Sequence, residues 1–219
     1  MKNSLYVAEV LIDPNKTVAS IQLPPASGGT MHIFAVGERA GNLNNIGITN
    51  SGATSIGAFD HYHGSSYSAQ ALQSQGLVSG QNFSSNGYSF PWPAAGTLDN
   101  YAAAGQTLPV TAPANASGVA FLGSATNGGA VGDVTITYTD GSTQTDSLAF
   151  LDWCNATRSI INWYPIIAAT MPYRNTQGGQ QTINNYIYFS EFKLDSTKTV
   201  QSITLPQSGT LHVFSYAFK

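Results

Sequence analysis

The chain has 219 residues, only 9% of which are Asp, Glu, Lys or Arg, and its formal net charge is −3. Globular domains carry about a quarter of charged residues, so most of this surface consists of uncharged polar groups. The sequence contains no basic cluster, which excludes an electrostatic footprint for nucleic acid or for an anionic membrane. No stretch approaches the ~18 apolar residues of a membrane span. Cys154 is the single cysteine, which excludes an intrachain disulfide.

The main organisational feature is an internal repeat. Residues 6–24 read YVAEVLIDPNKTVASIQLP, and residues 188–206 read YFSEFKLDSTKTVQSITLP. The heptapeptides TMHIFAV at 30–36 and TLHVFSY at 210–216 follow these two runs in the same order. Segments such as VASIQLP alternate apolar and polar residues with a period of two, which predicts short, half-buried strands.

The repeat leaves two interpretations of the domain organisation open. Residues 1–40 are either the tail of a preceding module or strands of the same sandwich as residues 41–219. We favour the second interpretation, because strands of about 5–6 residues need a sheet in order to stay folded. In both cases residues 41–219 are expected to form the β-sandwich module. His32 and His212, which match in the repeat, are interpreted as structural residues.

The middle of the chain, residues 42–183, has the composition of β-strands. Gly, Pro, Asn and Asp separate short runs that are rich in β-branched and aromatic residues. The dipeptide Asp140-Gly141 between two alternating runs predicts a tight hairpin, and the run SLAFLDW predicts a core position for Trp153. The stretch SAQALQSQG at 68–76 has the character of a short helix that a glycine ends. We therefore predict an all-β fold, a β-sandwich or jelly roll with one short helix.

A series of motifs in this part of the chain resembles a known kind of module. In order, they are FDHYHGSSYSAQAL (59–72), FPWP (90–93), LDN (98–100), FLGSATNG (121–128), YTDGSTQ (138–144), DW (152–153), MPYRN (171–175) and KTV…SITLP…LHVF (198–214). They resemble an all-β accessory module appended to secreted bacterial enzymes, notably glycoside hydrolases of the α-mannosidase type and some acid peptidases. The resemblance implies a secreted protein whose leader lies outside this chain, a carbohydrate-binding role, and a glycoside hydrolase as the parent protein.

The loop Asp60-His61-Tyr62-His63 departs from this resemblance, which implies a glycine-containing turn of the type FDGxGxSYS. His61 and His63 are two residues apart, so they share one face of an extended segment. With Asp60 they supply part of a zinc or copper site, which needs at least one further ligand. A turn with hydrogen-bonded rings, or the rim of a recognition site, explains the same residues without a metal. We favour a surface loop stabilised by Asp60. The sequence assigns no cofactor, and it leaves open whether a calcium ion stabilises a loop.

Asp99 and Asp152 are the best candidates for the two carboxyl groups that a glycosidase places on either side of its substrate. Both belong to motifs of the resemblance, LDN and DW. We favour the alternative that each carboxylate accepts hydrogen bonds from loop backbone N–H groups. The sequence has no GxSxG or HExxH motif, and it identifies no base that would activate Cys154. A non-catalytic protein is therefore favoured over an enzyme.

A sugar-binding interpretation fits the composition best. A sugar offers an apolar face to a flat ring and hydroxyl groups to a few well-placed polar partners. Trp92, between Pro91 and Pro93, is expected at a loop or sheet edge because proline cannot donate to the ladder. Arg174, next to Tyr173, can fork onto two hydroxyl groups or a carboxylate. The predicted ligand-binding residues are Asp60, His61, Tyr62, His63, Tyr67, Trp92, Asp99, Asn100, Trp163, Tyr173 and Arg174.

The leading hypothesis from the sequence is a non-catalytic, carbohydrate-binding accessory module of a secreted bacterial enzyme, with a polysaccharide or glycan as partner. The alternative is a structural module that packs against its own catalytic domain, or against tandem copies, by strand addition. A weaker alternative is a small β-sandwich enzyme that acts on glycans. Nucleic acid and membrane are not expected as partners.

Overall fold

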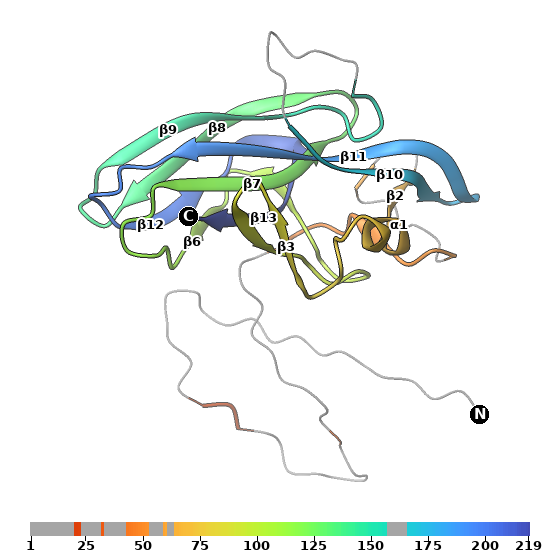
Figure 1. Cartoon of the computed structure of the whole chain (residues 1–219), viewed down its shortest axis with the longest axis horizontal. Coiled ribbons are helices and arrows are strands. Elements are labelled where there is room, and N and C mark those ends of the chain that lie inside the picture. The colour runs from red at the N-terminus through yellow and green to blue at the C-terminus, as the bar shows by residue number, and fades with distance from the viewer. Residues whose placement is uncertain (1–19, 23–31, 33–42, 53–58, 61–63, 157–165) are drawn as a thin grey trace. The chain divides into compact units, whose positions relative to one another are not determined.

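The computed structural model describes residues 20–22, 32, 43–52, 59–60, 64–156 and 166–219. The chain divides into two units, residues 1–40 and residues 41–219. In the first unit, Ser20–Gln22 and His32 are described, outside regular secondary structure, and the rest of the N-terminal repeat copy lies outside the described residues. The second unit consists of stacked layers of strands with one short helix (Figure 1). The predicted all-β fold is confirmed.

The larger sheet has seven strands. Its neighbouring strands run antiparallel, except for the first two in spatial order, which are parallel. In spatial order the strands are β1 (Ile48–Thr49), β2 (Ser66–Ser68), β10 (Ile166–Thr176), β11 (Gly179–Lys193), β7 (Gly118–Ala125), β13 (Gln207–Phe218) and β5 (Tyr101–Ala104).

A four-stranded antiparallel sheet covers one face of the larger sheet. In spatial order its strands are β6 (Thr107–Pro109), β12 (Val200–Thr204), β8 (Ala130–Tyr138) and β9 (Thr143–Phe150). β8 buries Val134 and Ile136 and leaves the threonines between and after them partly exposed, as an alternating strand does. The predicted turn at Asp140-Gly141 joins β8 to β9, and Gly141 has a φ of +83°.

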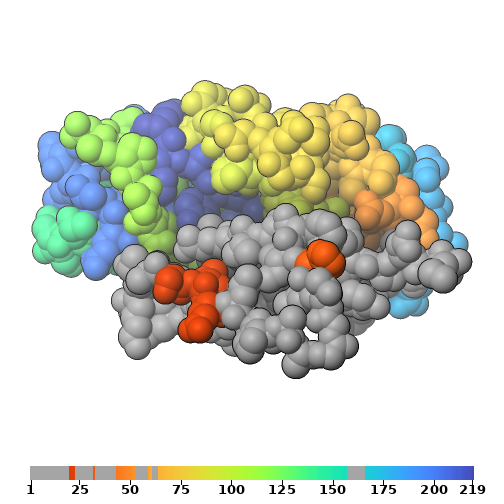
Figure 2. Space-filling view, turned by 90° about the horizontal axis from the view of Figure 1, so that it is seen from below, coloured from red at the N-terminus to blue at the C-terminus, as the bar shows by residue number. Residues whose placement is uncertain are grey.

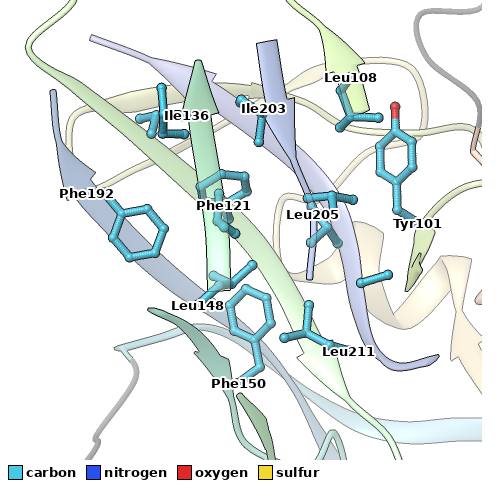
Figure 3. Packing of buried hydrophobic residues seen from close by; sticks show 14 of the residues in the cluster. Tyr101, Leu108, Phe121, Ile136, Leu148, Phe150, Phe192, Ile203, Leu205 and Leu211 are labelled. Carbon is cyan, nitrogen blue, oxygen red and sulfur yellow. The ribbon is translucent and has the colours of Figure 1, made fainter. Parts of the chain in front are cut away.

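The space between the two sheets holds the first of two apolar clusters. Ile136 and Leu148 of the smaller sheet pack there with Phe121 and Leu211 of the larger one (Figure 3). Every residue of β7, with the sequence GVAFLGSA, is buried. Phe121 belongs to this first cluster, whereas Leu122 belongs to the second cluster. The larger sheet is therefore buried on both faces, which explains why β7 is a continuous apolar run rather than an alternating one.

The second face of the larger sheet is covered by the hairpin of β3 (Asn82–Ser85) and β4 (Tyr88–Pro91) and by the helix α1 (Ala69–Ser74). The ring of Phe90 in β4 lies 6.1 Å from the ring of Phe189 in β11. α1 begins after Ser68, whose side chain accepts a hydrogen bond from the Ala71 N–H and so caps the helix. Figure 2 shows α1 (gold) and the β3–β4 hairpin (yellow) on one surface.

Candidate functional site

Three of the predicted ligand-binding residues, Asp60, Tyr67 and Arg174, are brought together at the β2 end of the larger sheet. Arg174 of β10 lies opposite Tyr67 of β2 in the antiparallel register. Tyr173 precedes Arg174 in β10, so its side chain points to the other face of the strand. Asp60 forms an isolated bridge with Ser65, which places it directly before β2. Pairing between strands that are distant in the sequence therefore assembles this group.

The guanidinium group of Arg174 is held from several sides. Its Nη1 lies 3.6 Å from Asp60 Oδ2, and its Nε donates a 2.8 Å hydrogen bond to Gln181 Oε1. Nη1 also lies 3.2 Å from Cys154 Sγ, and Cζ lies 5.1 Å from the centre of the Trp153 ring. Because the planar guanidinium has fixed donor directions, these contacts fix the orientation of its remaining donors.

Asp60 supplies the charge that balances Arg174. Its side chain is 4% exposed, and a buried carboxylate is stable only when it is paired or hydrogen-bonded. Within the described residues, Asp60 Oδ2 faces the guanidinium while Oδ1 has no hydrogen-bond partner. The prediction that Asp60 stabilises its loop agrees with this buried position. His61, Tyr62, His63 and Trp163 lie outside the described residues.

Three exposed side chains that the sequence did not single out lie on the β10–β11 hairpin, and one of them, Gln181, contacts Arg174 directly. Gln177, Gln181 and Thr182 are exposed, and Thr182 lies opposite Tyr173 in the register. A Cβ atom at Gly64, where φ is +53°, would collide with the Gln177 side chain, so glycine at this position lets Gln177 lie over the loop. The run RNTQGGQQT (174–182) is the sequence signal, because it is a long uncharged polar stretch with a turn at its centre. We call Asp60, Arg174, Gln177 and Gln181 the hairpin site.

Cys154 borders the hairpin site without being a nucleophile. Burial raises the pKa of its thiol to about 12, although the nearby guanidinium acts in the opposite direction. The thiol is therefore protonated at neutral pH, and a protonated thiol is a weak nucleophile. Its described contact is with Arg174 Nη1.

The candidate carboxyl groups, those of Asp99 and Asp152, accept hydrogen bonds from backbone N–H groups. Asp99 accepts hydrogen bonds from the N–H groups of Gly47 (2.7 Å) and Ile48 (2.8 Å). Asp152 accepts them from the N–H groups of Gly128 (2.7 Å) and Cys154 (2.8 Å). The favoured interpretation, in which both carboxylates hold loops, is confirmed.

Asn100 belongs to a buried polar network and not to a surface. It donates a 2.7 Å hydrogen bond to Asp99 and accepts one of 3.1 Å from Asn45. His212 Nδ1 lies 2.9 Å from Asn100 Oδ1, and His212 Nε2 lies 3.2 Å from Thr126 Oγ1. Asp99 and Asn100 are both 0% exposed, which corrects their assignment as ligand contacts: they tie the loop before β1 to β5 and β13.

Trp92 and Tyr67 also face inward, which is a second correction. Trp92 follows the edge strand β4 directly, so its predicted place at a sheet edge is right, but its ring is buried and stacks on Phe214 at 5.7 Å. Tyr67 is 0% exposed, and its hydroxyl donates to the backbone carbonyl of Tyr186. The proline residues beside Trp92 constrain its backbone but do not decide which face its ring occupies. Trp153 is buried, as predicted.

The described part of the chain contains no group of three or more His, Cys, Asp or Glu side chains that could hold a metal ion. Among the described residues, no helix has the length and apolar character required to cross a membrane. No family model matches the chain, and no curated protein matches it. The resemblance to an accessory module therefore stays a prediction.

Proposed function

We propose that the protein is a non-catalytic, carbohydrate-binding accessory module, and that it binds an uncharged, hydroxyl-rich glycan at the hairpin site. The observation that carries this proposal is the oriented guanidinium of Arg174, which is paired with Asp60 and hydrogen-bonded to the exposed, uncharged amide of Gln181. The parent protein would be a secreted bacterial enzyme, as the resemblance implies.

The chemistry of the hairpin site suits a sugar better than an anion or a cation. Gln177 offers an amide that both donates and accepts hydrogen bonds. Gln181, whose Oε1 accepts a hydrogen bond from Arg174 Nε, offers the N–H groups of its amide. Asp60 compensates the positive charge of Arg174, so the site as a whole makes contacts through hydrogen bonds rather than through net charge.

The arrangement of acids supports binding without bond cleavage. Asp99 and Asp152 hold loop backbone N–H groups. Asp60 faces a guanidinium, whereas a glycosidase acid faces a second carboxyl group across its substrate. An accessory module of this kind would raise the effective concentration of its parent enzyme at a polysaccharide surface.

A glycan array followed by affinity electrophoresis tests this proposal. We expect at least one neutral glycan to be retained, and we expect Gln177→Ala and Gln181→Ala each to weaken its binding about tenfold, since a lost hydrogen bond is worth about 1 kcal/mol. Gln201→Ala is the matched control, because Gln201 is exposed on β12 of the other sheet. Melting curves of the variants confirm that they are folded. Equal affinities for all three variants would show that the glycan does not bind at the hairpin site.

A further inference from the structure

The dipeptide Asn-Gly occurs twice in the chain, at residues 86–87 and at residues 127–128. Asparagine is one of the thermolabile residue types in proteins, because the backbone nitrogen of the next residue can attack its side-chain carbonyl carbon. A glycine in that next position has no side chain to block the attack. Both asparagines are exposed, and both have a positive φ, +50° at Asn86 and +60° at Asn127. The two sites are therefore alike in sequence, exposure and backbone region.

Asn86 and Gly87 form the two-residue turn that joins β3 to β4. Ser85 pairs with Tyr88 across this turn, and Gly87, like Asn86, has a positive φ, of +81°. Asn-Gly is the preferred dipeptide for such a hairpin turn. Gly87 is exposed, and nothing lies within 4 Å of its Cβ position. Within the described residues its N–H has no hydrogen-bond acceptor, so the nitrogen that would attack Asn86 is open to solvent.

The corresponding nitrogen of the second dipeptide is held by a carboxylate. The Gly128 N–H donates a 2.7 Å hydrogen bond to Asp152 Oδ2. An attack on Asn127 requires the Gly128 nitrogen to lose its proton, and a neighbouring negative charge disfavours the anion that would form. The hydrogen bond must also break first, and hydrogen bonds to an ionised acceptor are stronger than neutral ones. Asp152 therefore protects Asn127 from the reaction to which Asn86 is open.

We propose that Asn86 is a site of spontaneous deamidation by water in the folded protein, and that Asn127 is preserved. The Gly87 nitrogen loses its proton to solvent and forms a bond to Asn86 Cγ. The bond between Cγ and Nδ2 breaks, and the amide nitrogen takes up a proton and leaves as ammonia. The cyclic imide that results adds water at either of its carbonyl groups and opens to aspartate or isoaspartate. The net reaction consumes water and releases ammonia, without an oxidant or a reductant.

Both products alter the turn between β3 and β4. The chain has no Asp, Glu, Lys or Arg between Asp60 and Asp99, so the new carboxylate is the single charged side chain of this segment. Isoaspartate also adds an atom to the backbone, which a two-residue turn does not accommodate without a change of register. Tyr88 and Phe90 of β4 belong to the second apolar cluster. Deamidation is therefore expected to loosen the covering of the larger sheet as the protein ages.

Peptide mapping of the full chain by mass spectrometry, after incubation in mildly alkaline buffer, measures the loss of each side-chain amide. We expect Asn86 to react at least about tenfold faster than Asn127, a ratio that corresponds to about 1.4 kcal/mol of activation free energy. In urea, where the hydrogen bond of Gly128 is lost, the two rates are expected to approach each other. An Asn86 that stays intact, or equal rates at the two sites in the folded protein, would overturn the inference.

Two variants of the full chain test the cause and the consequence separately. Asp152→Asn removes the charge beside Gly128 and is expected to speed the reaction at Asn127 several-fold while leaving the rate at Asn86 unchanged. If melting curves show that this variant is unfolded, the comparison of folded and urea-unfolded wild type decides. Asn86→Gly keeps a turn that tolerates positive φ, and its melting temperature is expected to stay constant during incubation while that of the wild type falls. A folded Asp152→Asn protein with an unchanged rate at Asn127, or a wild type that loses the Asn86 amide without any fall in melting temperature, would contradict the account.

Discussion

At the scale of single residues, the buried polar network around His212 shows how this protein keeps polar groups inside without charge. Asn45, Asn100 and Thr126 surround the imidazole: Nδ1 lies 2.9 Å from Asn100 Oδ1 and 3.2 Å from Asn45 Nδ2, and Nε2 lies 3.2 Å from Thr126 Oγ1. Burial lowers the pKa of His212 from 6.5 to about 3. The ring is therefore neutral in the folded protein over the whole range in which a free histidine takes up a proton.

The lowered pKa of His212 predicts a loss of stability in acid. As the pH falls below about 6.5, the unfolded chain binds a proton at this residue and the folded chain does not, so unfolding becomes more favourable. Each pH unit then costs about 1.4 kcal/mol, which gives about 3 kcal/mol between pH 7 and pH 4. Denaturant unfolding across this range measures the effect.

The variant His212→Gln is the control for the contribution of other titrating groups, because its amide keeps a donor and cannot take up a proton. We expect its stability to fall less steeply with decreasing pH than that of the wild type. Parallel pH profiles for the two proteins would show that His212 does not contribute to acid sensitivity.

At the scale of secondary-structure elements, the alternation of apolar residues predicted which side chains are buried better than the individual motifs did. In YSFPW, a period of two places Trp92 on the same face as Tyr88 and Phe90, and that face is buried. The Asp140-Gly141 turn was likewise predicted from the sequence.

The hairpin site was only partly predictable, for a physical reason. Tyr173, Arg174 and the polar run after them are local in the sequence, and a turn at Gln177-Gly178 brings Gln181 back to Arg174. The pairing of β10 with β2, which adds Asp60, joins segments that are far apart in the chain. Without an alignment of related sequences, composition and periodicity do not specify such a non-local pairing.

The close approach of β7 and β13 gives a prediction at this scale. A Cβ atom at Gly123 would collide with the backbone carbonyl of His212 and with the ring of Phe150. Gly123→Ala is therefore expected to destabilise the protein by about 1–3 kcal/mol, the usual cost of overpacking. Gly209→Ala in β13 is the matched control, because nothing lies within 4 Å of the Cβ position there. A Gly123→Ala protein as stable as the Gly209→Ala protein would contradict this packing.

At the scale of the whole molecule, the second unit is a sheet of seven strands covered on one face by a four-stranded sheet and on the other by a hairpin and a helix. This arrangement buries the rings of Tyr67 and Trp92, which the sequence offered as ligand contacts. The hairpin site lies on β10, β11 and the loop before β2, where a rigid scaffold ends in exposed, uncharged side chains. The account therefore depends on recognition by few polar groups in fixed positions.

The most direct test of this account is a titration of the ¹⁵N-labelled protein with a glycan retained in the array, followed by two-dimensional NMR. The account predicts that the side-chain N–H signals of Gln177, Gln181 and Arg174 shift with increasing glycan concentration, while a reducing-end assay shows that the glycan stays intact. Shifts confined to Gln201 and Thr145 on the four-stranded sheet, or a steady release of reducing ends, would contradict it.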